Sequence, residues 1–375
     1  MFVYDTAIIG GGASGLFAGS MLGKKAIILE KGETSGRKLL LSGGGKCNFT
    51  HDSDPRQMLE HYTKPRFVAA AIHALPPKKI KEYFQHLGIE SYTTDEGKVF
   101  PTSNNASDIV SALEERCNIK TNTTVMSIAR NNGVFQIETN SGFIYSYNLI
   151  LATGGKSYSH TGSDGSGYKL AQMLGHKIIK PSPALAPIKL EPNLSKAEGI
   201  SKDITLRYNK KDYIGDIVIT RNGISGPLSL DISYMFDTAK SIQISFSECN
   251  VQELRRTHSK SMVKNALSLP ERLSEALLGE LSNKRVADLT KKEEILIETL
   301  ITKAPFTAIA IDKGAMTTHG GVDTSELDSK TMQSKLVDNL YIVGDLVDVD
   351  ANCGGYSLSW AFASAYIATQ SIIQK

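Results

Sequence analysis

Three glycines and one acid among the first thirty residues have the spacing of a dinucleotide-binding site. Gly10, Gly12 and Gly15 form a G-x-G-x-x-G pattern. Glu30 follows close to the expected distance of ~20 residues. Gly12 allows backbone N–H groups to approach a pyrophosphate, and a carboxylate at this distance accepts hydrogen bonds from ribose hydroxyls. These residue types therefore predict that the chain binds a dinucleotide.

The segments around this pattern are those that must position it. Phe2 to Ile9 is an apolar run, Leu16 to Leu22 has helical spacing of apolar and small residues, and Lys25 to Leu29 is a second apolar run. A strand, a glycine turn, a helix and a second strand form the βαβ unit of a Rossmann fold. The N-terminus of the helix adds about half a positive charge facing the phosphates.

A second group of reactive residue types lies between Gly36 and Asn48, where three consecutive glycines stand among cations and the thiol of Cys47. From Ser35 to Lys81 the chain has nine lysines and arginines against three acids, a local charge of +6. Such a segment is either a solvated face or a surface that meets phosphates. The phosphates would belong to a nicotinamide cofactor or to RNA.

Composition bounds the class of protein. The chain has 375 residues, of which 41% are hydrophobic and 22% charged, and this excludes a disordered or fibrous protein. The four cysteines have no paired spacing, which suits reduced thiols in the cytoplasm and predicts neither disulfides nor a metal site. Asp5 and the glycine turn argue against a signal peptide, and no apolar run is long enough to predict a membrane span.

The pattern of periodicity predicts an interrupted α/β fold. Turn signals between 119 and 151 predict a β-meander that leads into a buried strand at Leu149–Leu151. We expect a discontinuous nucleotide-binding domain at 1–186 and 306–375, a β-rich insert at 187–250 and a helical insert at 251–305. Helices are expected at Pro55–His61, Pro65–Ala74, Pro77–Leu87, Ala106–Arg116, Gly167–Leu174 and Tyr356 to about Ile373, and returning strands at Ala308–Ile311 and Leu340–Val343.

These motifs resemble those of a known family of flavoproteins. The stretch from Gly36 to Asn48 is similar to the G-R-K-x-x-x-S-G-G-G-R-C-N signature of the BaiN-like (YhiN-like, RdsA-like) FAD-dependent oxidoreductases. Further matches run in order through most of the chain, at Gly154–Tyr158, Gly223–Pro227, Leu269–Leu273, Thr331–Lys335 and Asp348–Tyr356. The resemblance implies a two-dinucleotide-binding-domain flavoprotein. Its Rossmann-like, three-layer FAD-binding domain with a β-meander would be interrupted by a β-barrel-like insert and a small helical insert.

The resemblance also implies where FAD lies. The carboxylate of Asp345 would hold the ribityl chain or the edge of the pyrophosphate, and the N-terminus of the last helix would face the flavin ring. The positions implied in FAD binding are Gly10, Gly12, Ala13, Ser14, Gly15, Glu30, Lys31, Arg37, Lys38, Ser42, Gly43, Gly44, Lys46, Cys47, Asn48, Val125, Thr153, Gly154, Gly155, Gly344, Asp345, Asp350, Gly354, Gly355, Tyr356 and Ser357. Lys46 stands where the family usually has arginine, which keeps the charge and loses the bidentate fork.

The chemistry implied is hydride transfer from reduced flavin to a C=C bond conjugated to a carbonyl, with a proton added at the adjacent carbon. Cys47 is the first candidate for the proton donor, against the alternative that it only packs beneath the flavin. Tyr158 and His160 are the second candidates, against a hydrogen-bonded loop phenol and an exposed imidazole. Only one complete fingerprint is present, so no dedicated second NAD(P) domain is expected. Either NAD(P)H docks transiently as the electron donor, or another donor reduces the flavin. His319 has no role that the sequence assigns.

Two substrate classes follow from the resemblance, a steroid-like small-molecule enone and a uridine of 23S ribosomal RNA reduced to dihydrouridine. The basic segment at Ser35–Lys81 and a second basic stretch, Arg255 to Lys264, favour RNA, although both suit a solvated surface as well. A flavin oxidase or hydroxylase is a further alternative. No metal and no membrane partner is expected, and the oligomeric state is left open.

Overall fold

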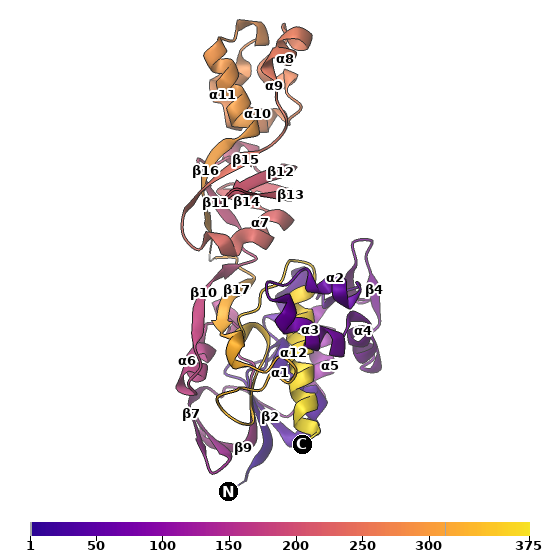
Figure 1. Ribbon diagram of the computed structural model, residues 1–375. Coiled ribbons are helices and arrows are strands. Elements are labelled where there is room, and N and C mark those ends of the chain that lie inside the picture. The colour runs from indigo at the N-terminus through magenta and orange to yellow at the C-terminus, as the bar shows by residue number, and fades with distance from the viewer. Residues whose placement is uncertain (1, 312) are drawn as a thin grey trace. The chain divides into compact units, whose positions relative to one another are not determined.

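The computed structural model describes residues 2–311 and 313–375, which fall into two compact units (Figure 1). The first comprises Met1–Ser182 and Met316–Lys375, and the second comprises Pro183–Ala315. Met1 and Asp312, both inside the expected nucleotide-binding domain, lie outside the described residues.

The first unit is built on a seven-stranded sheet. Its parallel strands read as short apolar runs because both of their faces are covered: all of β2 and the last four residues of β1 are buried. In spatial order the strands are β6 (Ile119–Lys120), β2 (Ala26–Leu29), β1 (Tyr4–Ile9), β9 (Gly142–Leu151), β8 (Val134–Thr139) and β7 (Val125–Asn131), with β18 (Leu340–Ile342) also paired to β9.

β9 joins the parallel sheet to the meander. Its first half pairs antiparallel with β8, and its second half pairs parallel with β1 and β18. The sequence predicts two strands here, and the structure has one. Asn148, between the strands expected at Phe143–Tyr147 and Leu149–Leu151, stays in the strand opposite Thr6 and donates its side-chain amide to the carbonyl of Asp5 at 3.0 Å. One continuous strand therefore carries the chain from the meander to the cofactor edge of the sheet.

Helices cover this sheet. α1 (Ala13–Leu22) packs on α5 (Ala106–Glu114) and on α12 (Tyr356–Ile373), and α12 packs in turn on α3 (Pro65–Ala74) (Figure 1). The ring of Phe17 in α1 lies 5.1 Å from that of Phe362 in α12. The remaining elements are α2 (Pro55–Leu59), α4 (Pro77–His86), α6 (Ser166–Met173), the sheet β3 (Thr50–His51), β5 (Lys98–Pro101) and β4 (Ser91–Thr93), and the pair β10 (Ile178–Ala184) and β17 (Thr317–Val322).

The second unit contains a closed six-stranded barrel, as the predicted fold class requires. Alternating residues such as Ile204 and Leu206 fill its core. The strands in order are β11 (Ile188–Glu191), β14 (Gly223–Ser225), β13 (Lys211–Thr220), β12 (Ser201–Tyr208), β15 (Lys240–Ser245) and β16 (Ala304–Ala310), with helices α7 (Pro227–Ile232), α8 (Val251–His258), α9 (Val263–Ala266), α10 (Glu271–Leu278) and α11 (Lys291–Thr302).

One returning strand belongs to the barrel. The expected domain boundary at residue 306 falls inside β16, which pairs with β11 and β15 and not with the nucleotide-binding sheet. Its alternating pattern suits either place, so only the pairing partners distinguish them. Helices α8 to α11 share a hydrophobic core with the barrel. Among the described residues, no helix combines the length and the apolar character that crossing a bilayer demands.

Candidate functional site

The glycine turn after β1 is closed on one side and open on the other. A Cβ on Gly15 would lie 1.9 Å from the carbonyl oxygen of Gly10, so the helix can approach the strand only because position 15 is glycine. A Cβ on Gly12 would meet no atom within 4 Å. α1 begins at Ala13 with no side-chain cap and no acid in its first turn. This arrangement leaves space and positive potential for an anion beside Gly12.

Glu30 directly follows β2, and backbone amides hold its carboxylate. The N–H of Gly11 donates to Oε2 at 2.7 Å, and the N–H of Gly32 donates to Oε1 at 2.7 Å. Each oxygen keeps a second lone pair, which a ribose hydroxyl can use. The N–H of Thr123 donates to the carbonyl of Glu30 at 2.9 Å, and this contact places the segment that leads to Val125 beside the acid.

An ion pair joins the N-terminal and C-terminal motifs. Lys38 Nζ lies 3.0 Å from Asp345 Oδ2 and 2.8 Å from Ser157 Oγ. The neighbouring Gly344 has a φ of 66°, and a Cβ there would lie 2.2 Å from Ser14 Oγ at the start of α1. Four segments expected to hold FAD are therefore brought together by direct contacts.

The loop that carries Ser42, Gly43, Gly44 and Lys46 has an unusual backbone. Gly43, Gly44 and Gly45 all have positive φ, and a Cβ on Gly44 would meet no atom within 4 Å. The loop therefore presents exposed backbone at Gly43 and Gly44, and Lys46 is exposed as well. Asn48 follows this loop and accepts a hydrogen bond from the N–H of Val99 at 3.2 Å through Oδ1.

Cys47 is fully buried in the hydrophobic core of the first unit. Burial raises the pKa of its thiol to about 11, and a hydrogen bond with Ser42 opposes that rise. A proton donor must reach the reacting carbon. Of the two roles weighed for Cys47, the structure therefore favours packing over proton donation.

Tyr158 and His160 lie on the loop after Thr153, Gly154 and Gly155. His160 is exposed and Tyr158 is half-buried, with their ring centroids 5.8 Å apart. Arg37 Nη2 donates to the carbonyl oxygen of His160 at 2.5 Å and anchors the loop. Lys31, expected beside the cofactor, pairs with Asp164 of the same loop at 2.8 Å.

The start of α12 and the loop before it make contacts that the sequence does not reveal. The ring of Tyr356 stacks on His51 and His61 with centroid separations of 4.8 Å and 4.2 Å. A Cβ on Gly355 would lie 2.6 Å from the carbonyl of Thr50, so this loop is pressed against β3. Ser357 follows in the first turn of α12. His51 and His61 stand about 300 residues earlier in the chain than Tyr356, and no spacing rule connects them.

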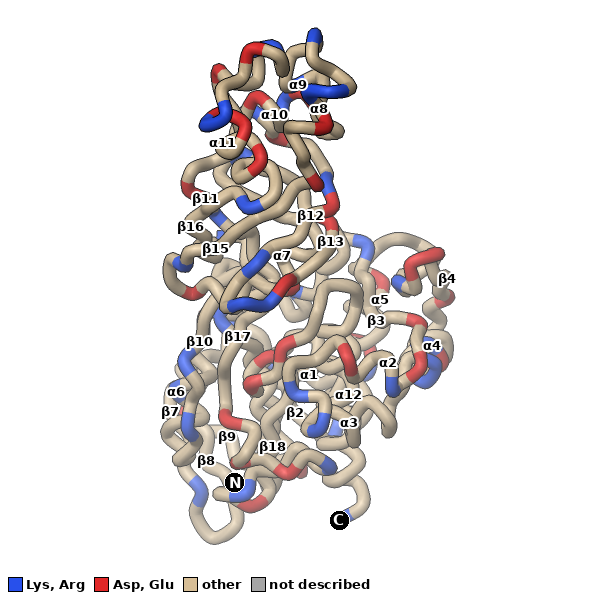
Figure 2. The backbone as a smooth tube through the Cα atoms, turned by 45° about the horizontal axis from the view of Figure 1, so that its top comes forward, with Lys and Arg blue, Asp and Glu red and all other residues tan. Residues whose placement is uncertain are grey.

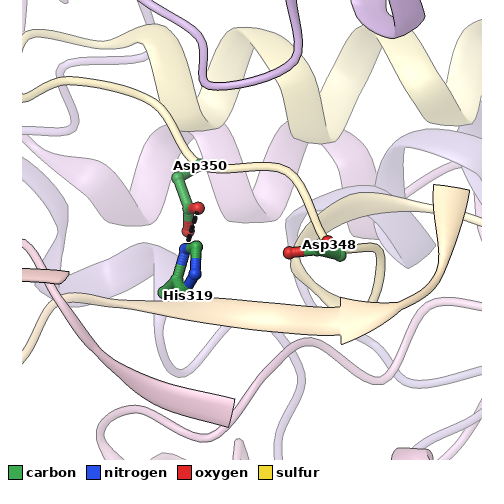
Figure 3. Close-up of side chains that lie close together, drawn as sticks. All are labelled: His319, Asp348 and Asp350. Carbon is green, nitrogen blue, oxygen red and sulfur yellow. Dashed lines mark hydrogen bonds and ion pairs between the residues drawn. The ribbon is translucent and has the colours of Figure 1, made fainter. Parts of the chain in front are cut away.

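His319, Asp348 and Asp350 form a polar cluster beside this loop, with candidate ligand atoms within 4.8 Å of one another (Figure 3). Asp350 accepts from His319, and Asp348 forms an ion pair with Lys64. The two carboxylates thus already have cationic partners, and we propose no metal here.

The residues of the first unit fit FAD. Open space beside Gly12 and the uncapped α1 suit the pyrophosphate, Glu30 suits the adenosine ribose, and Asp345 offers a partly exposed carboxylate to the ribityl hydroxyls. The hydrogen-bonding groups and the open space at Gly12 agree with the expected path of FAD from the glycine turn to α12.

Acidic residues lie among the lysines and arginines along the backbone (Figure 2), and several cations of the two basic stretches form ion pairs. Lys38, Lys64 and Lys81 each form an ion pair with an aspartate. In the second stretch, Arg255 pairs with Glu294, and Lys264 pairs with Glu271 and Glu275. Several cations of both stretches are therefore neutralised by acidic residues of the protein itself, which weakens the charge argument for RNA.

Comparisons with known proteins agree over the whole chain. The chain is 30% identical over 396 residues to the ribosomal RNA dihydrouridine synthase of Escherichia coli, covering 99% of this chain and 98% of that protein. It is 29% identical over 406 residues to the 3-dehydro-bile acid delta(4,6)-reductase of Clostridium scindens, with 98% of each covered.

Solved structures share the fold. A 3-ketosteroid delta1-dehydrogenase from Sterolibacterium denitrificans superposes with a TM-score of 0.55 at 12% identity, covering all of both chains. A flavocytochrome c3 fumarate reductase gives 0.54 at 14% identity, covering 99% of this chain and 78% of that one. The family profile described as "HI0933-like protein Rossmann domain" matches residues 4–371. The chain therefore belongs to the HI0933-like Rossmann family and is a flavoprotein oxidoreductase with an FAD-binding fold.

Proposed function

We propose that this protein reduces a uridine of 23S ribosomal RNA to dihydrouridine, in the cytoplasm, with FAD as cofactor and NAD(P)H as a transient electron donor. The observation that carries the proposal is the 30% identity, along 99% of the chain, to a ribosomal RNA dihydrouridine synthase. A second such enzyme, from Haemophilus influenzae, is 30% identical over 98% of the chain.

FAD would be held along the contacts described above. The turn at Gly10–Gly15 binds the pyrophosphate, Glu30 the ribose, and Asp345 the ribityl chain, while the loop from Gly354 to Ser357 approaches the flavin. Reduced FAD supplies the hydride for the C5–C6 double bond of uracil. The remaining positions implied by the sequence, including Val125, Thr153 and Asn48, would complete the walls of the site.

The protein must add a proton to the second carbon. Of the three candidates that the sequence names, Cys47 is buried, whereas solvent reaches His160 and part of Tyr158. Tyr158 and His160 therefore stay candidates for the donor, and a further residue is argued below. The uracil must leave its base stack to reach any of them.

Reduction of a small-molecule enone is the alternative. The full-length similarity to a bile acid reductase supports it, and the reaction is again addition of hydride and proton across a C=C bond conjugated to a carbonyl. The ion-paired cations of the basic stretches also fit this alternative, because a small enone needs no phosphate-binding surface.

Mapping of dihydrouridine in the host organism tests the proposal. Ribosomal RNA from a strain lacking this gene should have lost one dihydrouridine, and the wild-type gene should restore it. The gene carrying Gly12→Ala, which fills the space assigned to the pyrophosphate, should not restore it. An unchanged dihydrouridine content in the deletion strain would refute the RNA substrate.

A further inference from the structure

One histidine of the first unit is bonded to a buried carboxylate. His319 Nδ1 lies 2.5 Å from Asp350 Oδ2 (Figure 3). The side chain of Asp350 is 6% exposed and that of His319 is 33% exposed. The pair therefore has one end in the interior and one end that solvent reaches. Thr63 fixes the buried end, since its N–H donates to the Asp350 carbonyl at 3.0 Å and its Oγ1 accepts from the Asp350 N–H at 3.1 Å.

Charges around the pair set its protonation. The Asp350 carboxylate, with a smaller contribution from Asp348, raises the pKa of His319, while burial and Lys64 oppose that rise. Burial raises the pKa of Asp350, and Asp348 and Asp345 add to the effect. Burial raises the pKa of Tyr168 above its ordinary value, and the carboxylates of Asp345 and Asp350 add to the rise.

His319 is the histidine of this cluster, and its pKa is raised chiefly by its hydrogen bond with Asp350. Asp345 is paired with Lys38 and Asp348 with Lys64. An imidazole releases and regains its proton between pH 5 and 8 in ordinary surroundings. A carboxylate at Nδ1 holds the imidazolium and fixes the orientation of the ring.

The pair also joins two segments assigned to FAD. His319 follows Thr318, whose Oγ1 accepts from the N–H of Lys156 at 2.7 Å and would lie 2.6 Å from a Cβ on Gly155. Asp350 stands at the start of the loop that leads to Gly354. The pair is thus built into the same walls as the proposed cofactor site.

We propose that His319 donates the proton in the reduction, and that Asp350 is the positioning residue that holds its imidazolium. The inference rests on the proposed function. The π bond of the acceptor breaks as one carbon takes the hydride from reduced FAD, and the other carbon takes the proton of His319. FAD is left oxidised, the C=C bond is reduced, and neutral His319 regains a proton from solvent.

Other histidines of the first unit are less suited to this step. Both ring nitrogens of His51 are engaged, by Ser53 at 3.2 Å and by the carbonyl of Glu96 at 3.0 Å. Burial and the neighbouring His51 lower the pKa of His61, which disfavours a stored proton. His160 is exposed, and among the described residues no carboxylate pairs with its imidazole.

Reduction of the FAD-loaded enzyme by NADPH and its reoxidation by the acceptor are measured separately, because only the second step needs the proton of His319. His319→Gln should retain FAD and be reduced by NADPH at the wild-type rate, but should pass electrons to the acceptor about 10²-fold more slowly. The wild-type rate of acceptor reduction should fall as pH rises through the pKa of His319. Asp350→Asn should move that fall to lower pH, because removing the carboxylate lowers the pKa of the imidazole.

His176→Gln is the matched control, because His176 also pairs with a carboxylate, Glu326, at 2.9 Å. Its stability should fall while the pH profile keeps its shape. Wild-type acceptor reduction in His319→Gln, or a loss confined to His160→Gln, would overturn the inference.

Assays with two different electron acceptors distinguish failure of the inference about His319 from failure of the proposed function. The same variants are assayed with unmodified ribosomal RNA and with a steroid enone. Activity on the enone alone refutes the RNA substrate, and the pH profiles on the enone still decide the role of His319. If neither acceptor reoxidises the enzyme, the proposed function fails. An NMR titration then tests the positioning role separately, because a His319 pKa unchanged by Asp350→Asn contradicts that role and a lowered one supports it.

Discussion

Lys38 Nζ lies 3.0 Å from Asp345 Oδ2, although 307 residues separate the two in the chain. The lysine comes from the loop after β2, and the aspartate follows β18. Between them the chain forms the meander and the whole of the second unit. This contact brings a motif near the N-terminus and a motif near the C-terminus of the chain into one site. It also positions both side chains at the place proposed for the ribityl chain of FAD.

Asp345→Asn should weaken FAD binding by about tenfold to a hundredfold. The change removes a charged acceptor from the proposed ribityl contact and its partner from Lys38, and hydrogen bonds to charged groups contribute about 1.5–3 kcal/mol. Quenching of flavin fluorescence during titration of the apoprotein gives the affinity. Glu82→Gln is the control, since its pair with Lys78 is exposed and spans 3.9 Å. Equal affinities for the two variants would remove Asp345 from the site.

Gly12→Ala and Gly15→Ala should separate cofactor binding from folding. A Cβ on Gly12 meets no protein atom within 4 Å, so this variant should keep the wild-type melting temperature of the apoprotein and lose FAD. A Cβ on Gly15 would lie 1.9 Å from a backbone carbonyl, and this overlap should cost about 1–3 kcal/mol of unfolding free energy. Thermal melts and flavin absorbance measure both. FAD retained by Gly12→Ala would refute the pyrophosphate site.

Cys47→Ala should lower stability and leave turnover within a factor of about ten. Removing a buried side chain leaves a cavity that costs about 1 kcal/mol for so small a group. A donor role would instead cost 10²–10⁴-fold in rate. Thiol labelling provides an independent check, because a buried thiol with a pKa near 11 should resist iodoacetamide at pH 8 while the exposed Cys353 reacts. Rapid labelling of Cys47 would contradict the packing role.

Exposed arginines outside ion pairs should carry the affinity for RNA. Arg56 and Arg66 are exposed and have no acidic partner among the described residues. Replacing either by alanine should reduce the slope of log affinity against log salt by about one. Lys264→Ala should leave the slope unchanged, since Glu271 and Glu275 already neutralise that lysine. Identical slopes for all three variants would argue for a small-molecule substrate.

The nucleotide-binding half was predictable because its signals are local. The turn at Gly10–Gly15, the acid at Glu30 and the helix Tyr356–Ile373 are each specified by neighbouring residues, and the structure has them where they were predicted. The strand predicted at Ala308–Ile311 overlaps the end of β16 and lies in the barrel, whereas the expected boundary at residue 306 placed it in the nucleotide-binding domain. An alternating pattern fixes the faces of a strand, but its partners depend on segments far away in the chain.

The chemistry-bearing contacts were harder to predict, for a physical reason. Cys47 sits among cations and glycines in the sequence, yet its left-handed backbone directs it into the core. His51 and His61 meet Tyr356, and His319 meets Asp350, only after the chain has folded. Ion pairing likewise removes charge from Lys64 and Arg255 that a count of residues treats as free.

Conversion of uridine in vitro tests the central claim most directly. The purified FAD-loaded protein, NADPH and 23S ribosomal RNA transcribed without modifications are incubated, and the digested RNA is analysed by mass spectrometry. We expect one uridine to gain the mass of two hydrogens, and the Gly12→Ala protein to leave it unchanged. Wild-type protein that oxidises NADPH with a steroid enone but leaves every uridine unreduced would contradict the account.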